Sequence, residues 1–491
     1  KSIMITFILS LLALVLGYFV YGRFVERVFG PDDRETPAIA KADGVDFMVL
    51  PNWKIFMIQF LNIAGTGPIF GAIMGAKFGP SAYLWIVFGC IFAGATHDYL
   101  SGMISMRKGG VGLPEVIGDV LGERTRKLML VFSVVLLTMV GAVFVYSPAE
   151  ILDDMAGTTT MWIIIIFAYY FIATMLPVDK VIGRIYPLFA FSLLFMAAAL
   201  MVVLLAKWPE IPELWDGLGN KALTVDPSWS NQLFPCLFIT IACGAISGFH
   251  ATQSPLMGRC MKSERMGRPI FYGAMITEGV VALIWATVAS YFFYAEPQPG
   301  YQVITEFANN GFSTSAPKVV NIICNDWLGV AGGILAMLGV VAAPITSGDT
   351  ALRSARLIIA DFIRIEQRTV KRRLLISVPL FLCCIALLLW QVENPDGFNV
   401  IWQYFGWSNQ TLSVFTLWAI TVYLLQNGKP YYFMLIPALF MTTICATYLF
   451  VSKQAFGMPD TIGYILGVVV LIVAYGWFHI YESKYKKNNK I

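Results

Sequence analysis

The stretch Asn-Ile-Ala-Gly-Thr-Gly-Pro-Ile-Phe-Gly at residues 62–71 lies inside an apolar run long enough to cross a membrane. Pro68 removes a helical N–H and crowds the preceding turn, while Gly65 and Gly67 tolerate backbone that is not helical. An open turn inside lipid is costly unless it is buried in protein or lines a wet cavity. The stretch therefore predicts an interrupted membrane helix at a functional site, with a simple proline kink packed against a neighbour as the alternative.

A second stretch of the same character is Ala-Cys-Gly-Ala-Ile-Ser-Gly-Phe-His-Ala-Thr-Gln-Ser-Pro at residues 242–255. It has glycines, a proline and several polar side chains where a lipid-facing helix would carry Leu and Val. Two interrupted segments at corresponding positions of two halves point to the binding site of a transporter. A stripe of glycines four residues apart in the first segment is predicted to serve close helix packing; it comprises Gly67, Gly71, Gly75 and Gly79.

The composition agrees with a membrane protein. Of the 491 residues, 58% are hydrophobic and 13% are charged, whereas soluble proteins carry about a quarter charged residues. This excludes a disordered chain, a collagen, a disulfide scaffold and a nucleic-acid binder. The eight cysteines contain no CxxC pair, and most lie in apolar runs, so we predict neither a disulfide framework nor a metal site from them.

A membrane helix needs roughly 20 apolar residues to cross a hydrocarbon core about 30 Å thick. A window of that length predicts about thirteen spans. They are 3–22, 54–76, 82–106, 128–149, 160–177, 185–207, 233–256, 269–294, 327–347, 374–391, 400–425, 431–452 and 461–481. We expect the first to be a retained anchor, because it is too long for a signal peptide and no small-residue cleavage site follows it.

Basic residues alternate between the two sets of loops. Most of the 34 lysines and arginines follow odd-numbered spans. The opposite set of loops holds only Lys1, Lys77, Lys207, Lys221, Lys318 and Lys453. Because cytoplasmic loops collect Lys and Arg, we expect the amino terminus outside and the carboxyl tail in the cytoplasm.

Spans 2–6 and 7–11 form two sets of five, each beginning with an interrupted helix. Span 2 starts in the cytoplasm and span 7 starts outside, so the sets are inverted relative to each other. We therefore predict an all-α polytopic protein with a LeuT-type 5+5 inverted repeat, one extra helix before it and two after it. The expected segments are an anchor helix and linker (1–53), the first repeat (54–232), the second repeat (233–426) and two accessory helices with a basic tail (427–491).

Five motifs resemble the carbon starvation protein A family of bacterial inner-membrane carriers. They are Asp43–Phe47, Ile63–Pro68, Gly94–Asp98, Gly244–His250 and Phe405–Gln410. They occur in the right order over almost the whole chain. The resemblance implies a carrier of the amino acid–polyamine–organocation superfamily in the bacterial inner membrane, with uptake of peptides or pyruvate as its activity.

The interrupted stretches supply the candidate substrate contacts, because freed N–H groups and positive helix ends suit a substrate carboxylate near the bilayer midplane. The candidates are Asn62, Gly65, Thr66, Gly67, Gly244, Ser247, Gly248, His250, Gln253 and Asn409. An interhelical hydrogen bond is the alternative for His250. A packing role is the alternative for the run 407–410 that contains Asn409.

Carboxylates inside the membrane are the candidates for coupling to protons. Asp98 lies roughly 12 Å from the cytoplasmic end of span 3, and Glu278 about 14 Å into span 8. Placing such a group at the bilayer centre costs about 2.5–3.5 kcal/mol on insertion scales, so it needs a partner or a function. The alternative is a carboxylate that only bonds a broken-helix amide. His97 joins the candidates, although neighbours on a helix point about 100° apart and we expect no pair between His97 and Asp98.

The end of span 9 suggests sodium as the other coupling ion. Thr346 and Ser347 occupy the eighth core position, where sodium-coupled LeuT-type carriers place a Thr-Ser pair. Their hydroxyls could bind Na⁺ together with carbonyls near Asn62 and Ala64, or could bond backbone as such hydroxyls commonly do in membrane helices. Asp349 is a further coupling candidate, with a pair to Arg353 four residues on as the alternative.

These features predict a secondary active transporter for a small solute that carries a carboxylate, driven by H⁺ or Na⁺. No cofactor is expected besides the coupling ion, and the partners are the solute and the lipid bilayer, with no nucleic acid. A channel, a nutrient sensor and an intramembrane enzyme are the rivals. The enzyme is the weakest of them, because no HExxH or GxSxG motif appears.

Overall fold

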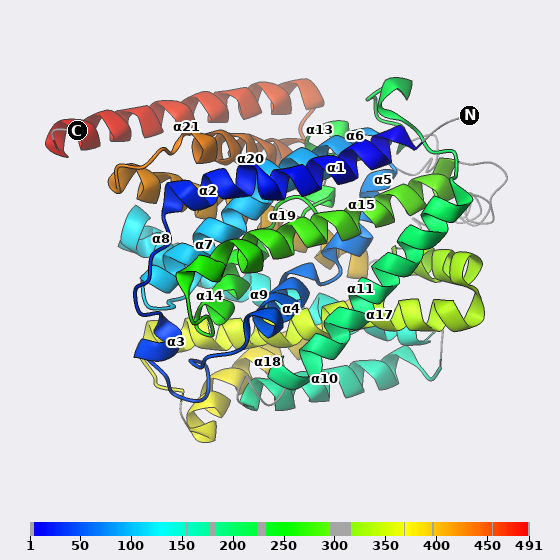
Figure 1. Cartoon of the computed structure of the whole chain (residues 1–491), viewed down its shortest axis with the longest axis horizontal. Coiled ribbons are helices and arrows are strands. Elements are labelled where there is room, and N and C mark those ends of the chain that lie inside the picture. Colours follow the sequence, from blue (N-terminus) through cyan, green and yellow to red (C-terminus); the bar gives the residue numbers. More distant parts are fainter. Residues whose placement is uncertain are drawn as a thin grey trace.

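The computed structural model describes residues 4–153, 156–176, 182–222, 232–294, 316–367, 369–394, 397–453 and 455–489. Within these residues every regular element is a helix, which confirms the all-α part of the predicted fold. Figure 1 shows the long helices lying side by side along the longest axis of the molecule, with α21 at one edge and α10 and α18 at the other. The predicted boundary between the two repeats, at 232/233, falls at the first residue of α13.

The helices, in chain order, are numbered as in Figure 1. They are α1 (Ile5–Phe19), α2 (Tyr21–Phe29), α3 (Pro37–Ala40), α4 (Asn52–Ala64), η1 (Gly67–Gly71), α5 (Ala72–Ala76), α6 (Ser81–Leu84), η2 (Trp85–Gly94), α7 (Ala95–Arg107), α8 (Leu113–Leu121), α9 (Glu123–Asp153), α10 (Thr159–Met175), α11 (Ile182–Lys207), η3 (Leu214–Asp216), α13 (Leu233–Thr240), α14 (Gly248–Gly258), η4 (Glu264–Met266), η5 (Arg268–Tyr272), α15 (Gly273–Tyr294), α17 (Ala316–Ile363), α18 (Val370–Glu393), α19 (Gly397–Gln426), α20 (Tyr432–Val451) and α21 (Asp460–Asn489).

Seven of the described helical stretches are long and apolar enough to cross a membrane, and the bent pair Asn52–Ala64 and Gly67–Ala76 makes eight if it counts as one span. Each lies at the position of an expected span. Helices also lie at the other expected positions, including α10, the split pair α13 and α14, and α17, which is interrupted at Gly329. The total of thirteen spans remains a prediction.

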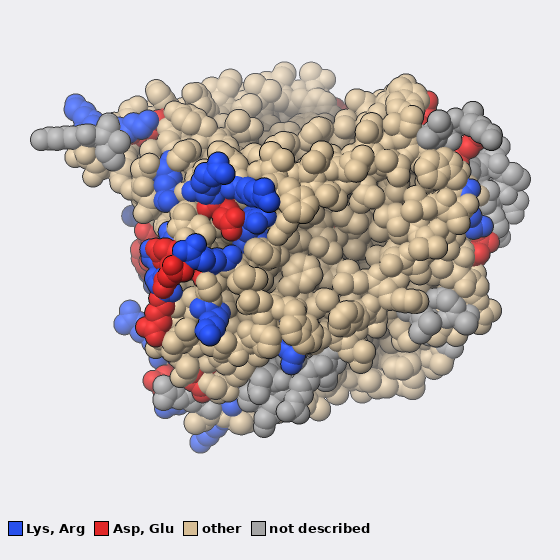
Figure 2. All heavy atoms as spheres, viewed as in Figure 1, with Lys and Arg blue, Asp and Glu red and all other residues tan. Residues whose placement is uncertain are grey.

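The surface charges gather at the two ends of the molecule. Figure 2 shows most of the visible Lys and Arg at one end and a smaller group at the other, with a broad uncharged band between them. The carboxyl terminus lies at the strongly charged end and the amino terminus at the opposite end (Figure 1). An uncharged band between two charged ends is what a protein that spans a bilayer presents to lipid and water.

The first expected interruption is present, but its cause differs from the prediction. Helix α4 ends at Ala64, and Gly65 takes φ +49°, a left-handed conformation that favours glycine. The chain resumes at Gly67 in a wide π-helical turn, and the two halves are bent by 53°. Pro68 lies at the start of this second half, where its missing N–H costs nothing. The break is therefore made by Gly65, and Pro68 begins the next helix.

The second interruption is longer. Helix α13 ends at Thr240 and α14 begins at Gly248, and residues 241–247 between them are not helical. Pro255 lies within α14, downstream of the break. The membrane span predicted at 233–256 is thus two short helices joined by an unwound segment.

The two interruptions touch each other through the glycine stripe. A Cβ on Gly67 would collide with the Cys243 side chain, and one on Gly75 would collide with Ile241. A Cβ on Gly71 would lie 2.9 Å from the carbonyl oxygen of Thr240. Three of the four glycines therefore serve close packing, as predicted, and they bring the second half of the first broken span against the turn of the other.

The linker before α4 is bound to two distant helices at the charged end. Asp46 lies 3.5 Å from Arg353 and 3.9 Å from Arg356 of α17, and all three side chains are buried. Beside it, Met48 and Leu50 donate backbone hydrogen bonds to the carbonyls of Arg259 and Cys260, just after α14. Residues 46–50 thus connect α14 and α17.

We expect Gly248→Ala to destabilise the protein, because the new Cβ would fall against Ser413 N and Asn409 O, both backbone atoms of α19. Overpacking of this kind costs about 1–3 kcal/mol. Gly476→Ala is the matched control, since a Cβ there has no neighbour within 4 Å and alanine favours the helix by about 1 kcal/mol. Thermal unfolding of the purified variants measures the difference. Equal melting of Gly248→Ala and wild type would contradict the close approach.

Candidate functional site

A buried ionisable cluster lies where α7, α14 and α15 meet. Asp98 of α7 is at its centre and accepts hydrogen bonds from two imidazoles. His97 Nδ1 lies 2.8 Å from one carboxylate oxygen, and His250 Nδ1 of α14 lies 2.8 Å from the other. All three side chains are fully buried. The expectation that His97 and Asp98 do not pair is wrong: adjacent side chains can still meet when the flexible carboxylate turns toward the ring.

Glu278 of α15 faces the outer side of the His250 ring. The distance between His250 Nε2 and Glu278 Oε2 is 3.6 Å, which is too long for a good hydrogen bond. Neither the Nε2 atom nor the two Glu278 oxygens has a hydrogen-bond partner among the described residues. The structure therefore brings together all four expected ionisable groups of spans 3, 7 and 8, and it leaves one edge of the cluster unsatisfied.

Cys243 also joins this cluster, although it was not among the predicted site residues. Its Sγ, the ring nitrogen of His250 and a Glu278 oxygen all lie within 4.8 Å of one another. On a continuous helix, residues seven apart are separated by about 10 Å along the axis. Only the unwound segment 241–247 lets Cys243 and His250 approach. A cysteine seven residues before a histidine, across a predicted break, was the available signal.

Asn409 holds the start of α14. Its Oδ1 accepts a 2.9 Å hydrogen bond from Ser247 Oγ and a 2.7 Å bond from the backbone N–H of Phe249. This is the role of a helix N-cap residue, performed by a residue of another helix, α19. The neighbouring Gln410 donates to the Phe238 carbonyl. These contacts agree with the packing interpretation of the run 407–410, and they place Ser247, Gly248 and Asn409 around one helix end.

Unsatisfied polar atoms also occur at the first break. Both side-chain atoms of Asn62 and the hydroxyl of Thr66 are buried and have no hydrogen-bond partner among the described residues, and the same holds for Oε1 of Gln253. Buried polar groups in proteins are nearly always paired. Gly244 packs beside this turn, since its Cβ would lie 2.5 Å from Ala282 and 3.9 Å from Pro68 Cα. The candidate residues of the two breaks thus concentrate unpaired donors and acceptors.

Thr346 and Ser347 of α17 form hydrogen bonds with different partners. Ser347 Oγ donates to the carbonyl of Leu61 (2.7 Å) at the end of α4, and a Cβ on Gly65 would lie 3.5 Å from it. Thr346 Oγ1 bonds carbonyls of its own helix at 2.9 and 3.0 Å. Of the pair, Ser347 is therefore the one that contacts the broken helix.

Asp349 lies on the same helix but bonds a different neighbour. Its carboxylate accepts a hydrogen bond from the Tyr186 hydroxyl of α11. Arg353, the alternative partner suggested by the sequence, instead lies 3.5 Å from Asp46. Within the described part of the chain, Asp349 makes no hydrogen bond or ion pair with the residues around Asp98, so its assignment to that coupling set has no geometric support.

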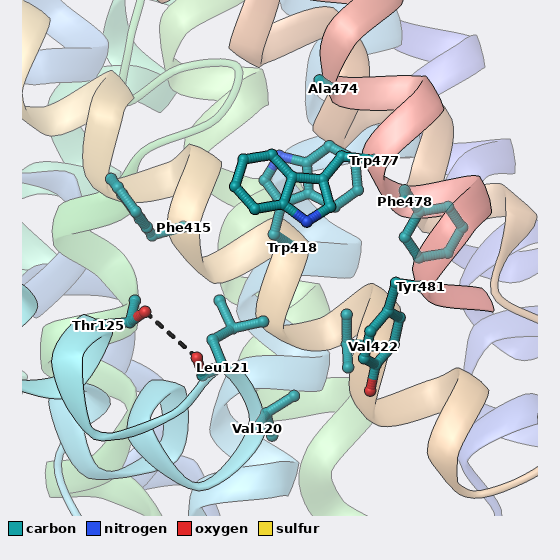
Figure 3. A pocket seen from close by; sticks show the side chains of 10 residues that line it. All are labelled: Val120, Leu121, Thr125, Phe415, Trp418, Val422, Ala474, Trp477, Phe478 and Tyr481. Atoms are coloured by element: carbon teal, nitrogen blue, oxygen red, sulfur yellow. Dashed lines mark hydrogen bonds between the residues drawn. The ribbon is translucent and has the colours of Figure 1, made fainter. Parts of the chain in front are cut away.

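A groove on the outside of the molecule has a different chemistry. It encloses about 530 Å³ between α8, the start of α9, α19 and α21. Figure 3 shows Trp418, Trp477 and Phe478 around it, with Tyr481 at one side. The residues that line it carry no carboxylate, imidazole or cationic side chain, and most of them are aromatic or aliphatic.

Comparison with known proteins identifies relatives along the chain. The model of a family described as "Carbon starvation protein CstA" matches residues 2–154, 145–321 and 300–448. An uncharacterized membrane protein of Haemophilus influenzae is 44% identical over 60% of this chain and 92% of its own length. The peptide transporter CstA of Bacillus subtilis is 27% identical over 95% of this chain and 94% of its own length.

Solved structures share the fold at low sequence identity. A manganese transporter of Eremococcus coleocola superposes with a TM-score of 0.56 at 12% identity, covering 90% of this chain and 99% of that chain. A Na⁺-coupled sialic acid symporter superposes with a TM-score of 0.54 at 14% identity, covering 95% of this chain and 96% of that one. These likenesses concern the fold alone.

We expect Asn409→Ala to lower the stability by about 1–3 kcal/mol, because it leaves the buried N–H of Phe249 without an acceptor. Ser247→Ala should cost less, since the backbone bond to Asn409 remains. Asn427→Ala, at an exposed position of the helix end, is the control and should melt with wild type. Thermal unfolding of the three variants gives the ranking. Asn409→Ala melting with Asn427→Ala would contradict the capping role.

Proposed function

The chain belongs to the carbon starvation protein CstA family, and from that premise we propose that it is a secondary active transporter. The proposed cargo is a small solute with a carboxylate, either a short peptide or pyruvate. Support comes from the Bacillus subtilis relative, which is named a peptide transporter and matches along nearly the whole length of both chains. That name also agrees with the prediction that the chain is a carrier and not an enzyme.

The observation that carries this proposal is the meeting of two broken helices around unpaired polar groups. The N-terminal end of α14 begins at the break, at Gly248, and the positive end of its helix dipole suits a carboxylate. Asn62 and Thr66 supply unpaired donors and acceptors on the facing turn. The residues proposed to contact the solute are those of the two breaks, from Asn62 to Gly67 and from Gly244 to Gln253, with Asn409 holding them in place.

We propose that the helices are arranged as two inverted repeats of five, α4 to α11 and α13 to α19, within thirteen spans. The interrupted helices are then the first member of each repeat, and alternating access moves one group of helices against the other around the breaks. The amino terminus is proposed to lie outside and the carboxyl terminus in the cytoplasm of a bacterial inner membrane. The strongly charged end of Figure 2 is then the cytoplasmic one.

Two coupling routes are compatible with the contacts. For protons, four neighbouring side chains can bind and release H⁺, and they extend to the second break. They are His97, Asp98, His250 and Glu278. For sodium, Ser347 and the Leu61 carbonyl bring hard oxygen atoms to the first break. A cation bound at either place would have an affinity that depends on the arrangement of the broken helices, which is the requirement for coupling.

The test of the function is uptake by the purified protein in proteoliposomes. We expect labelled dialanine or pyruvate to accumulate against its gradient when an inward H⁺ or Na⁺ gradient is imposed, and the gradient that works identifies the ion. Liposomes without protein and a preparation with both gradients dissipated are the controls. Movement only down the gradient of the solute would indicate a channel. Binding without movement would indicate a sensor, and no response to either solute would contradict the proposal.

Two substitutions then separate the coupling routes. If protons drive uptake, Glu278→Gln should reduce uphill accumulation by about tenfold or more, while exchange of labelled for unlabelled solute continues because exchange needs no net proton movement. If sodium drives uptake, Ser347→Ala should raise the half-saturating Na⁺ concentration by a similar factor. Thr421→Ala is the control, because its hydroxyl only bonds the Leu417 carbonyl within α19. Unchanged accumulation in both variants would remove both routes.

A further inference from the structure

We propose that Cys243, His250 and Glu278 form a binding site for a divalent cation of the zinc class. The inference does not rest on the transport activity, and it assigns chemistry to a cysteine that the proposed function does not use. The three side chains come from the unwound segment before α14, from α14 and from α15, and each is fully buried.

The distances fit ligands of one ion better than they fit hydrogen bonds. The three ligand atoms lie within 4.8 Å of one another. Zinc binds imidazole nitrogen and carboxylate oxygen at about 2.0–2.2 Å and thiolate sulfur at about 2.3 Å, which places tetrahedral ligands about 3.3–3.7 Å apart. The 3.6 Å between His250 Nε2 and Glu278 Oε2 lies in this range. A small contraction around an ion would complete the geometry.

The free atoms point to the same site. His250 Nε2 and both Glu278 oxygens have no hydrogen-bond partner in the described part of the chain. An ionised Asp98 can only accept, so His250 donates from Nδ1 (2.8 Å) and its lone pair is on Nε2. A carboxylate that orients a metal-binding imidazole in this way is the usual support of a zinc ligand. The ring is therefore already held in the tautomer that binds a metal.

The ligand types and their charges select the ion. One sulfur, one nitrogen and one carboxylate oxygen suit a borderline cation such as Zn²⁺ or Co²⁺, whereas Na⁺, Mg²⁺ and Ca²⁺ prefer oxygen ligands alone. The Cys243 thiolate and the Glu278 carboxylate together balance the two positive charges of the ion, and the Asp98 carboxylate is stabilised by its hydrogen bonds from His97 and His250. Neutrality matters here, because an uncompensated charge in a buried membrane site is costly.

The break in the helix creates this site and leaves one position open. Asn409 Nδ2 lies 3.8 Å from Cys243 Sγ, and the Cys243 side chain packs directly on Gly67. The sulfur is thus fixed between the two interruptions. With three protein ligands, a four-coordinate ion keeps its fourth position for water or for a solute oxygen.

Metal content of the full-length protein is the first measurement. The protein is produced in medium supplied with zinc, purified without chelator and washed free of loose ions, and zinc is determined by elemental analysis. We expect a zinc content close to stoichiometric with the chain in wild type and a loss of about tenfold or more in Cys243→Ser. Cys445→Ser, at another buried cysteine outside the cluster, should keep the wild-type content. Wild-type protein with no zinc above the Cys243→Ser level would overturn the proposal.

Cobalt provides an independent readout that reports the ligands themselves. Co²⁺ replaces zinc during expression, and a sulfur-to-cobalt charge-transfer band in the near ultraviolet is expected in wild type and in Cys445→Ser. Cys243→Ser should lose this band, while Glu278→Gln should keep it with weaker binding. Size-exclusion and thermal-unfolding profiles show that each variant is folded. A charge-transfer band that survives in folded Cys243→Ser would place the sulfur ligand elsewhere and refute the site. Zinc content and the cobalt band are measured without any solute, so their outcome and the outcome of the uptake experiment are decided separately.

Discussion

The centre of the molecule depends on the close contact between the glycine stripe of the first broken span and the unwound turn of the second. Two helices interrupted inside a membrane expose backbone groups that lipid cannot satisfy. Here the interruptions are buried against each other, because Gly67, Gly71 and Gly75 have no side chains in the way. An amide from α19 satisfies the start of α14. The same contact that makes the breaks tolerable also concentrates polar groups between them.

Much of the fold followed from the sequence because a bilayer allows few solutions. Length and hydropathy predicted helices at positions where the structure has them, and the two stretches with glycine and proline marked the breaks. The exact cause of the first break was missed. Pro68 looks like a helix breaker in isolation, whereas the positive φ of Gly65 ends α4, and only the backbone distinguishes a proline that stops a helix from one that begins it.

Most residues of the site could be predicted from the sequence, but the contacts between them could not. Buried carboxylates and histidines in a membrane are rare enough to stand out, so Asp98, His250 and Glu278 were identifiable. Their mutual contacts depend on how three helices pack, which local patterns do not encode. Cys243 was missed for the same reason. It lies seven residues before His250, and the two side chains come close only because the segment between α13 and α14 is not helical. Asn409 was identified as a candidate, but only the structure shows that it caps the start of another helix, α14.

The linker at residues 46–50 has a consequence for motion. It joins the end of α14 to α17 through the Asp46 ion pairs and two backbone hydrogen bonds. These two helices carry the second break and the serine that touches the first. Separating them at that end would first have to release the linker and leave two buried guanidinium groups without their counter-ion, which is expensive. Together with the Ser354–Thr252 hydrogen bond and the Arg259–Asp361 ion pair, which join the two helices directly, the linker therefore opposes their separation on that side.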